Sequence, residues 1–296
     1  MTDIPIDHID DDDTWRFDAD NPNLKILREV GQIGHFVRNK VAVEPIRQIC
    51  LLDVETTGID PQVDKIIDLA YVILAVDDED DIVGIVCAEQ ALCDPTMPIP
   101  PRITLLTGLT DQDVCGNAIN LDRVEWDFAS VDVFVAHNCA FDLSFVGQLL
   151  PITQKAAWAC SLKDFDWLLE AGLGGKALGH LLMEVGFFHT GHRAMADVVA
   201  LLHILSHQLD DGRTVLGALL SNAEEDTVKV EAVNAPYSAR LQLKARGYQW
   251  EPKAKVWWTE IAQHEVGTEQ LWLGLHVLQH RPSPRMTKVT WRERHR

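Results

Sequence analysis

The sequence predicts an α/β fold followed by a second, smaller domain, and three observations support this. Runs rich in apolar and β-branched residues follow one another, as in an antiparallel meander, at positions 49–54, 66–76 and 82–92. Strand-like and helix-like segments then alternate between residues 131 and 209, which is typical of a mixed sheet with helices packed on it. The composition changes after the turn at residues 210–212, and we therefore place a domain boundary within residues 212–230.

The first 45 residues precede these runs and are strongly acidic at their start. Eight aspartates lie within the first twenty positions, and four of them are consecutive, from Asp10 to Asp13. Few large apolar residues and no clear period accompany them. We therefore expect a mobile, solvated acidic arm with a short helix at residues 23–30.

The region after the meander predicts its elements in order. A buried strand at residues 131–136 is followed by an amphipathic helix at residues 140–149. The later patterns predict a strand at 157–160, helices at 162–170, 176–185 and 194–209, a helix at 214–223, a polar break at 224–226 and a strand at 228–233.

The composition is that of an ordinary globular protein. With 296 residues, 47% hydrophobic and 24% charged, the chain can form one large and one small domain. No apolar run approaches the roughly 20 residues that cross a bilayer, and the acidic N-terminus lacks the layout of a secretory signal. Six scattered cysteines without a C-x-x-C pair indicate buried, reduced thiols. We expect a cytoplasmic protein with no membrane association.

The net charge of −19 is unusual for a protein that binds nucleic acid, because such binding is ordinarily electropositive. The charge is unevenly distributed. Residues 228–296 carry 12 Lys and Arg against 6 Asp and Glu, so the rest of the chain carries −25. Bound divalent cations would offset part of this acidity. The balance argues against a tight, non-specific binder of duplexes.

The motif Asp53-Val-Glu-Thr-Thr-Gly58 ends the first apolar run. Positions i and i+2 of a strand point the same way, so Asp53 and Glu55 present two carboxylates to one face. Such neighbours repel unless they share a cation, and a hard metal such as Mg²⁺ or Mn²⁺ suits them. Two solvated acids at a strand end are the alternative. Thr56, Thr57 and Gly58 add two hydroxyls and a backbone that a phosphate or sugar can approach closely.

The motif His137-Asn-Cys-Ala-Phe-Asp142 follows the next buried strand and enters a helix. Asp142 lies in the first turn of that helix, where the helix dipole also favours an acid. Asn138 fits the N-cap position. Phe141 has the character to stack on a base, although an aromatic residue here also fits the core. Taken alone, Asp142 is compatible with a catalytic or a structural role.

The motif His192-Arg-Ala-Met-Ala-Asp197 follows a Thr-Gly pair, which indicates a loop that enters a helix. Asp197 would lie one turn into the helix and His192 on the loop. A neutral imidazole beside an attacking water is a suitable general base near neutral pH. His189 competes for this role, and only the spacing to Asp197 favours His192.

The ordered set D-x-E, H-N-x-x-F-D and H-x-x-x-x-D resembles the DnaQ-like (DEDDh) 3′–5′ exonucleases, which include the proofreading subunit of bacterial replicative DNA polymerase. The resemblance covers residues 46–211. It extends to residues 103–109, where Thr107 matches the family's Thr-Gly stretch near the terminal nucleotide. The resemblance implies an RNase H-like mixed five-stranded sheet flanked by helices.

By this resemblance, Asp53, Glu55 and Asp197 would hold the metal that activates water. Asp53 would also reach a second metal with Asp142 assisting, and His192 would take the proton. The implied reaction uses two Mg²⁺ or Mn²⁺ ions and releases nucleoside 5′-monophosphates from the 3′ end of single-stranded DNA. Weaker candidates for holding that end are Thr56, Thr57, Gly58, Thr107, His137, Asn138 and Phe141.

The C-terminal third is basic and rich in tryptophan. After a linker or helix at residues 212–229, residues 230–296 predict a small α+β domain that holds five of the nine tryptophans. Gly247 fits a helix C-cap, and a Trp-rich strand follows Pro252. Lys and Arg interleaved with Trp and Tyr suit single-stranded nucleic acid, whereas most of the tryptophans fit the core of a tiny domain. We expect this domain to increase the affinity for longer strands.

Two other interpretations stay open. An exoribonuclease that trims RNA would use the same chemistry, because recognition of the 2′-OH depends on local pocket geometry. A non-catalytic, nucleic-acid-binding adaptor is a different class, and the complete acid set argues against it. The expected partners are 3′ ends of single-stranded DNA or RNA and a DNA polymerase or repair protein. No Gln-plus-apolar-plus-Phe clamp-binding peptide follows residue 205, which weakens membership of a replicative polymerase.

Overall fold

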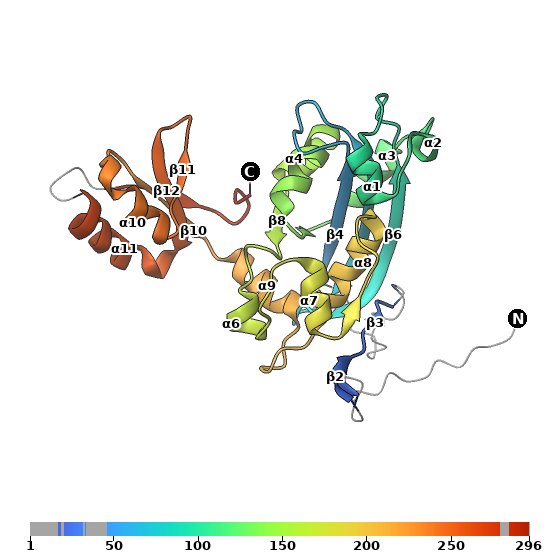
Figure 1. Cartoon of the computed structure of the whole chain (residues 1–296), viewed down its shortest axis with the longest axis horizontal. Helices are drawn as coiled ribbons and strands as arrows, with labels where there is room; N and C mark the ends of the chain where they lie inside the picture. Colours follow the sequence, from blue (N-terminus) through green and yellow to red (C-terminus); the bar gives the residue numbers. More distant parts are fainter. Residues whose placement is uncertain (1–16, 19–20, 32, 34–45, 279–283, 296) are drawn as a thin grey trace, which may run out of the picture. The chain divides into compact units, whose positions relative to one another are not determined.

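The computed structural model divides the chain into two compact units, residues 1–220 and 221–296 (Figure 1). The residues that the structure describes are 17–18, 21–31, 33, 46–278 and 284–295. The acidic arm expected over the first 45 residues therefore lies largely outside the described residues. The division between the units falls inside helix α9 (Val215–Glu224).

The first unit is built on a mixed five-stranded sheet. Its strands are β4 (Arg47–Thr56), β5 (Ile66–Val76), β6 (Ile82–Leu92), β7 (Val133–Ala136) and β8 (Ala157–Cys160). The first three form an antiparallel meander, and β7 and β8 continue the sheet in parallel on the other side of β4. The order β6-β5-β4-β7-β8 confirms the predicted RNase H-like α/β fold, with β4 at its centre.

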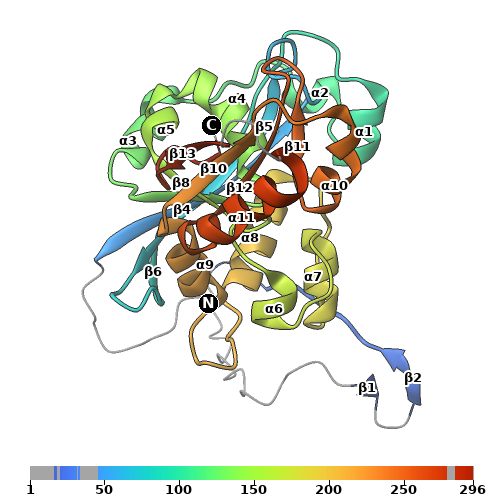
Figure 2. The ribbon, with the colours of Figure 1, turned by 90° about the vertical axis from the view of Figure 1, so that its left-hand side faces the viewer.

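Helices surround this sheet, and those at residues 139–149 and 194–205 contact its strands (Figures 1 and 2). Their bounds are α1 (Pro101–Thr107), α2 (Asp111–Val114), α3 (Leu121–Phe128), α4 (Cys139–Leu149), α5 (Pro151–Lys155), α6 (Trp167–Ala171), α7 (Leu178–Glu184) and α8 (Ala194–Leu205). Among the described residues, no helix combines the length and the apolar character that spanning a membrane requires.

The two faces of β4 have different partners, because successive side chains of a strand alternate. Leu52 and Val54 belong to a core cluster that includes Phe145 of α4. Helix α8 contacts β4 and β5 and carries a nearly continuous apolar surface. Asp53 and Glu55 point away from the cluster around Leu52 and lie on the same face as α8. The alternation of β4 thus separates the core side from the acidic side.

Two predicted helices are shorter than expected. The helix expected at 162–170 begins only at Trp167, because the Asp166 side chain accepts hydrogen bonds from backbone N–H groups at the helix start. The helix expected at 194–209 ends at Leu205. Both differences concern the ends of helices, where boundaries are least certain from sequence.

The short helix expected at residues 23–30 is wrong. Residues 23–30 instead contribute to the strands β2 (Asn21–Lys25) and β3 (Arg28–Glu29). Strand β1 (Phe17–Asp18) precedes them, and β9 (Phe187–Phe188) lies much later in the chain. Strand β3 runs parallel to β9, and the Arg28 N–H donates to the Gly186 carbonyl at 3.0 Å. Pairing with a distant segment therefore overrides the local helical tendency.

The second unit has a four-stranded antiparallel sheet in the order β11-β12-β10-β13. Its elements are β10 (Thr227–Ala232), η2 (Tyr237–Ala239), α10 (Arg240–Ala245), β11 (Gln249–Glu251), β12 (Val256–Ala262), η3 (Gln263–Glu265), α11 (Val266–Leu273), η4 (Gly274–Leu278) and β13 (Arg285–Val289). Gly247 follows α10 with a φ of +90°, as expected of a glycine that ends a helix. This is the small α+β arrangement that the sequence predicts.

Candidate active site

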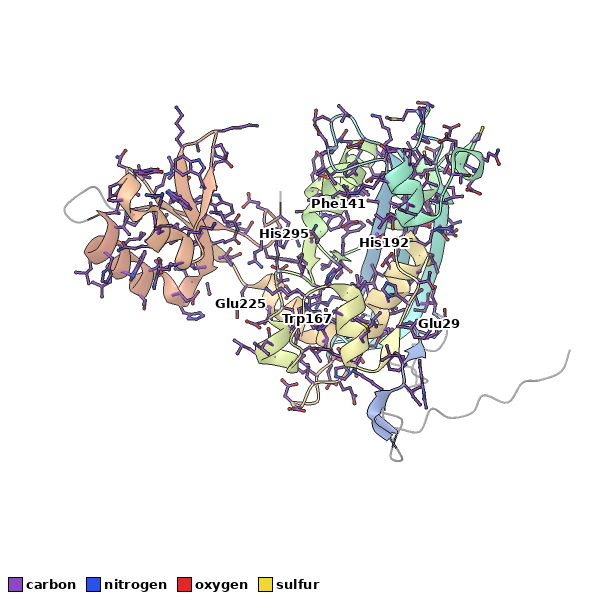
Figure 3. All side chains as sticks on the ribbon, viewed as in Figure 1. Glu29, Phe141, Trp167, His192, Glu225 and His295 are labelled. Atoms are coloured by element: carbon purple, nitrogen blue, oxygen red, sulfur yellow. The ribbon has the colours of Figure 1, made fainter. Side chains whose placement is uncertain are left out.

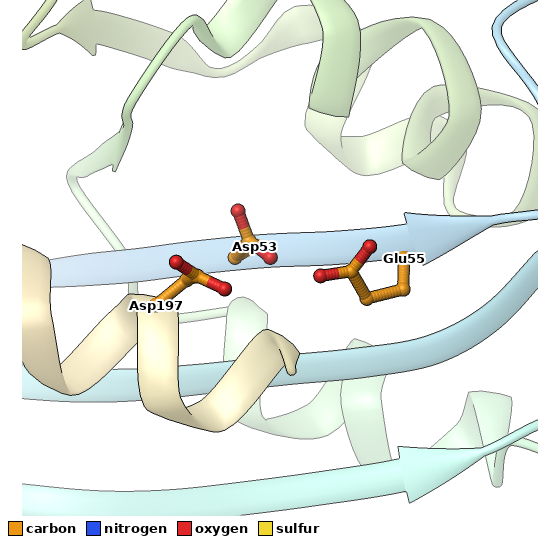
Figure 4. Close-up of side chains that lie close together, drawn as sticks. All are labelled: Asp53, Glu55 and Asp197. Carbon is orange, nitrogen blue, oxygen red and sulfur yellow. The ribbon is translucent and has the colours of Figure 1, made fainter. Parts of the chain in front are cut away.

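Three carboxylates converge on the α8 face of the sheet (Figure 4). Asp53 and Glu55 project from β4, and Asp197 comes from the first turn of α8. One oxygen from each of the three side chains lies within 4.8 Å of the others. Carboxylate oxygens are the ligands that Mg²⁺ and Mn²⁺ prefer, so the donor set fits a hard divalent cation.

Asp142, the fourth predicted acid, lies on α4 beside this group. It is only 2% exposed, and its Oδ1 accepts a hydrogen bond from the Val54 N–H at 3.2 Å. The bond fixes the start of α4 beside Asp53. Among the described residues, Asp142 does not belong to the three-carboxylate group itself. After burial, the charge of Asp142 is nevertheless the largest cause of the raised pKa of Asp53.

The charges of these acids are unfavourable without a cation. Burial, followed by repulsion from Asp142 and Asp197, raises the pKa of Asp53 well above its ordinary value. Burial and the charges of Asp197 and Asp68 raise the pKa of Glu55 to about 7. A divalent cation would favour the ionised carboxylates and so offset both effects.

The Asp197 carboxylate is held at both of its oxygens. Nε2 of His189 lies 2.9 Å from Oδ1. The backbone N–H groups of His192 and Arg193 donate to Oδ2 at 2.7 and 3.2 Å. His192 has a φ of +65°, in the left-handed region that is uncommon for a residue with a side chain. The loop before α8 therefore fixes the orientation of this acid.

The two histidines of this loop are placed differently. The side chain of His189 is 11% exposed and is directed at Asp197. His192, which is labelled in Figure 3, is exposed. Within the described part of the chain, the His192 ring forms no hydrogen bond. His189 thus supports a carboxylate, while the ring nitrogens of His192 are accessible from solvent.

A further buried acid on this face was not among the predicted site residues. Asp68 of β5 is opposite Glu55 in the register of the two strands and is 0% exposed. Nε2 of Gln90 donates to its two oxygens at 2.9 and 2.8 Å. The Arg193 guanidinium approaches Asp68 to 3.4 Å. An aspartate inside an otherwise apolar strand was the available signal, because a buried charge requires partners.

Thr56, Thr57 and Gly58 form the turn after β4. Thr56 Oγ1 donates to the Gly58 carbonyl at 2.5 Å, and Thr57 Oγ1 donates to Asp64 at 3.1 Å. A Cβ on Gly58 would lie 2.6 Å from Cγ of Asp64, so no larger residue fits without movement. The hydroxyls are thus used inside the turn, and their contact with a substrate stays a prediction.

Residues of the second motif are partly used by the fold. Nδ1 of His137 lies 2.8 Å from Oγ of Ser161, and burial lowers the pKa of His137. Phe141 packs against the core cluster, with its ring centroid 5.0 Å from that of Phe145. Asn138 occupies the N-cap position of α4 with a φ of +80°, but its side chain caps no N–H group. Asn138 is exposed, so its amide remains accessible from solvent.

Thr107 ends helix α1 and is only 4% exposed. Its Oγ1 donates to the Ile103 carbonyl at 3.0 Å and accepts from the Leu109 N–H at 3.1 Å. Gly108 follows with a φ of +72° and terminates the helix. The Thr-Gly stretch is therefore a helix-ending turn, and its predicted contact with a nucleotide is not yet tested.

The central mixed sheet and its acidic group define the class of the protein as a nuclease with an exonuclease-type domain. An exonuclease family model, RNase_T, matches residues 50–205, which is more than half of the chain. The chain belongs to this RNase_T exonuclease family. The membership confirms the DnaQ-like resemblance of the sequence.

Curated relatives include subunits of bacterial DNA polymerase III. The epsilon subunit of Treponema pallidum is 27% identical over 186 residues, which cover 60% of this chain and 83% of the relative. The PolC-type polymerase of Clostridium perfringens is 29% identical over 206 residues, which cover 66% of this chain. The match spans only 13% of that much longer PolC protein.

Solved structures with a related arrangement include an E. coli exonuclease I–single-stranded DNA complex. It has 16% identity and a TM-score of 0.47, and the match covers 83% of this chain and 64% of that chain. Exonuclease X in complex with 5′-overhanging duplex DNA has 22% identity and a TM-score of 0.39. That match covers 57% of this chain and 99% of the other.

Proposed function

We propose that this protein is a divalent-metal-dependent 3′–5′ exonuclease that releases nucleoside 5′-monophosphates from single-stranded DNA, in proofreading or repair. The observation that carries the proposal is the group formed by Asp53, Glu55 and Asp197. Their oxygens lie within 4.8 Å of one another inside a domain of the exonuclease family. DNA is favoured over RNA because the relatives are subunits of DNA polymerase III.

Asp53, Glu55 and Asp197 would hold one cation, and Asp53 with Asp142 would hold a second. Two Mg²⁺ or Mn²⁺ ions bound there would stabilise the charges that develop on the attacking and leaving oxygens. The side chains themselves are positioned in advance. The Asp142 carboxylate accepts a hydrogen bond from the backbone of β4, and the Asp197 carboxylate accepts one from the backbone of the loop before α8.

His192 is the proposed general base. Its ring is exposed on the same loop whose backbone holds Asp197, so the base and this carboxylate keep a fixed relation. In the reaction, a ring nitrogen accepts a proton from the attacking water. A neutral imidazole can do this near neutral pH.

Among the candidates for holding the 3′ end, Asn138 has the strongest support. It is exposed at the start of α4, and its amide is not used as a helix cap. The hydroxyls of Thr56, Thr57 and Thr107 already form hydrogen bonds within turns. We therefore propose Asn138 as a contact to the terminal nucleotide. A DNA polymerase or a repair protein is the proposed partner.

The test is digestion of 3′- and 5′-labelled single-stranded DNA and RNA with Mg²⁺, Mn²⁺ or EDTA. Stepwise shortening from the 3′ end that requires a metal is expected, with DNA preferred. Asp197→Ala should lower turnover by at least ~10³-fold, since each ion supplies several kcal/mol of transition-state stabilisation. Asp122→Ala is the matched control, because Asp122 is an exposed acid in the first turn of α3.

Three outcomes would contradict the proposal. Near-wild-type turnover of Asp197→Ala would remove the acidic group from the reaction. Digestion in EDTA would exclude the dependence on metal. Preferred digestion of RNA would replace the proposed substrate with the one that an exoribonuclease uses.

A further inference from the structure

The second unit has a sheet face that its helices do not cover. Val228 of β10 packs into the core of the unit with Leu243 of α10. The alternate positions of β10, which include Lys229, therefore belong to the opposite face. Trp258 of β12 lies on that face too, because it pairs with Glu231 in the strand register. Figures 1 and 2 show α10 and α11 together on the other side of this sheet.

Three aromatic rings of the second unit each lie close to a cation. The distances from cation to ring centroid are 4.8 Å for Lys229–Trp258, 4.2 Å for Arg240–Tyr237 and 5.1 Å for Arg292–Trp291. Tyr237 is 79% exposed, and the rings of Trp258 and Trp291 are partly exposed. A cation beside an accessible ring offers an electrostatic contact and a stacking surface at one place.

These three cations have no counter-charge within bonding distance. In the part of the chain that the structure describes, Lys229, Arg240 and Arg292 form no ion pair with a carboxylate. Other cations of the unit do, in the pairs Arg246–Glu269, Arg285–Glu231, Lys288–Asp226 and Arg294–Glu260. The acids of the unit therefore neutralise cations other than those beside the three rings.

We propose that the second unit binds single-stranded DNA through these three ring–cation pairs, of which Lys229–Trp258 lies on the uncovered sheet face and Arg240–Tyr237 at the start of α10. The second unit, residues 221–296, carries 12 Lys and Arg against 9 Asp and Glu, and this excess favours a polyanion. The exposed rings favour a single-stranded nucleic acid, because bases inside a duplex present no free face for stacking on an aromatic ring. The site rests on the residues of this unit, whereas the choice of DNA over RNA rests on the proposed function.

The second unit thus provides a second binding site for the substrate. The chain connects the second unit to the first. A DNA strand that is bound at the second unit therefore presents its 3′ end to the acidic group of the first unit at a raised effective concentration. A strand that is too short to occupy both sites at once gains no affinity in this way. A dependence of binding on strand length is therefore the signature of this site.

The experiment measures fluorescence anisotropy of labelled oligothymidylates with the full chain in EDTA, where no hydrolysis is expected. One oligomer has about 30 nucleotides and the other about 4, because a site of this kind spans ~4–16 nucleotides. The variants are Tyr237→Ala with Arg240→Ala, Lys229→Gln and Arg292→Gln. The controls are Leu241→Ala, which alters an exposed side chain of α10, and Arg213→Gln, which removes an exposed cation from the first unit.

The double variant should weaken binding of the long oligomer by about tenfold, as expected for the loss of one stacked base. Each cation removed should lower the slope of log Kd against log salt by ~0.7. The affinity for the short oligomer and the affinities of both control variants should be unchanged. Tyr237→Phe keeps the ring and should therefore bind like the wild type, and the circular dichroism of the double variant should match the wild type.

Unchanged affinity for the long oligomer in all three variants would overturn the proposal. So would equal losses for the long and short oligomers, or tighter binding of oligouridylate than of oligothymidylate. The two proposals fail independently. If Asp197→Ala digests normally while the ring–cation variants lose binding, only the proposed reaction is wrong. If digestion requires Asp197 and the metal while these variants bind normally, only the second site is wrong.

Discussion

Nε2 of His189 lies 2.9 Å from Oδ1 of Asp197, so a histidine outside the three sequence motifs holds one of the predicted metal ligands. Nδ1 of His189 is buried and has no hydrogen-bond partner among the described residues. The ring proton therefore belongs on Nε2, where it faces the carboxylate. The histidine and the backbone of residues 192–193 orient Asp197 from two directions.

His189→Ala should weaken Mn²⁺ binding by about 10- to 100-fold, because groups that orient a metal ligand contribute this much to affinity. His189→Gln should recover part of the loss, since its amide can donate to Asp197. Isothermal titration calorimetry measures the affinity. His180→Ala is the control, because His180 is a half-exposed histidine that contacts Glu184 instead. Equal affinities for His189→Ala and wild type would remove His189 from the site.

His192→Asn should lower turnover by about 10²- to 10⁴-fold, the usual contribution of a general base. Asparagine is chosen because it tolerates the left-handed backbone that His192 adopts, with a φ of +65°. The Mn²⁺ affinity should stay at the wild-type value, because Asp197 is held by the backbone N–H of residue 192. Single-turnover hydrolysis and calorimetry together check this. Wild-type turnover of His192→Asn would remove His192 as the general base.

Without metal, stability should depend on pH through Glu55. The pKa of its carboxyl is about 7 in the folded state and ordinarily 4.5, so the folded state keeps the proton over this interval. The unfolded state loses its proton first, and the free energy of unfolding therefore falls as the pH rises from about 4.5 to about 7.

The measurement is urea unfolding in EDTA across this pH range, for the wild type and for Glu55→Gln. The difference between the two isolates Glu55 from the buried histidines, whose lowered pKa values act in the opposite direction. Glu55→Gln should gain stability relative to wild type as the pH rises. Saturating Mg²⁺ should abolish the trend in the wild type. Parallel curves in EDTA would show that Glu55 titrates normally.

Gln90→Leu should destabilise the first unit by about 1–3 kcal/mol, because it leaves the buried Asp68 carboxylate without its amide donor. The double variant Asp68→Asn with Gln90→Leu should lose less stability than Gln90→Leu alone, since no charge then remains at position 68. Equilibrium urea unfolding of the two single variants and the double variant completes the cycle. Additive losses would mean that the amide and the carboxylate do not interact.

The central sheet was predictable because its strands are local apolar patterns. Period-2 alternation in β4 was enough to place Asp53 and Glu55 on one face, and the structure brings Asp197 to them. Asp142 was compatible with two roles from sequence alone. Its bond to the Val54 N–H shows that it also joins α4 to β4.

The supporting residues were not predictable, because they depend on pairings between distant segments. Asp68 becomes a neighbour of Glu55 only through the β4–β5 register. Arg193 approaches Asp68 only once α8 packs on the sheet. The helix expected at residues 23–30 failed for the same reason, since β3 takes its hydrogen bonds from β9.

The acidic group draws its members from opposite ends of the domain, with Asp53 on the first strand of the central sheet and Asp197 on α8. During synthesis, β4 emerges from the ribosome long before α8 does. The nascent chain thus carries isolated carboxylates throughout most of translation, and the full set assembles only when the last helix on the sheet docks. Any nuclease activity of this site therefore requires the complete domain, because Asp53 and Asp197 come together only when α8 packs on the sheet.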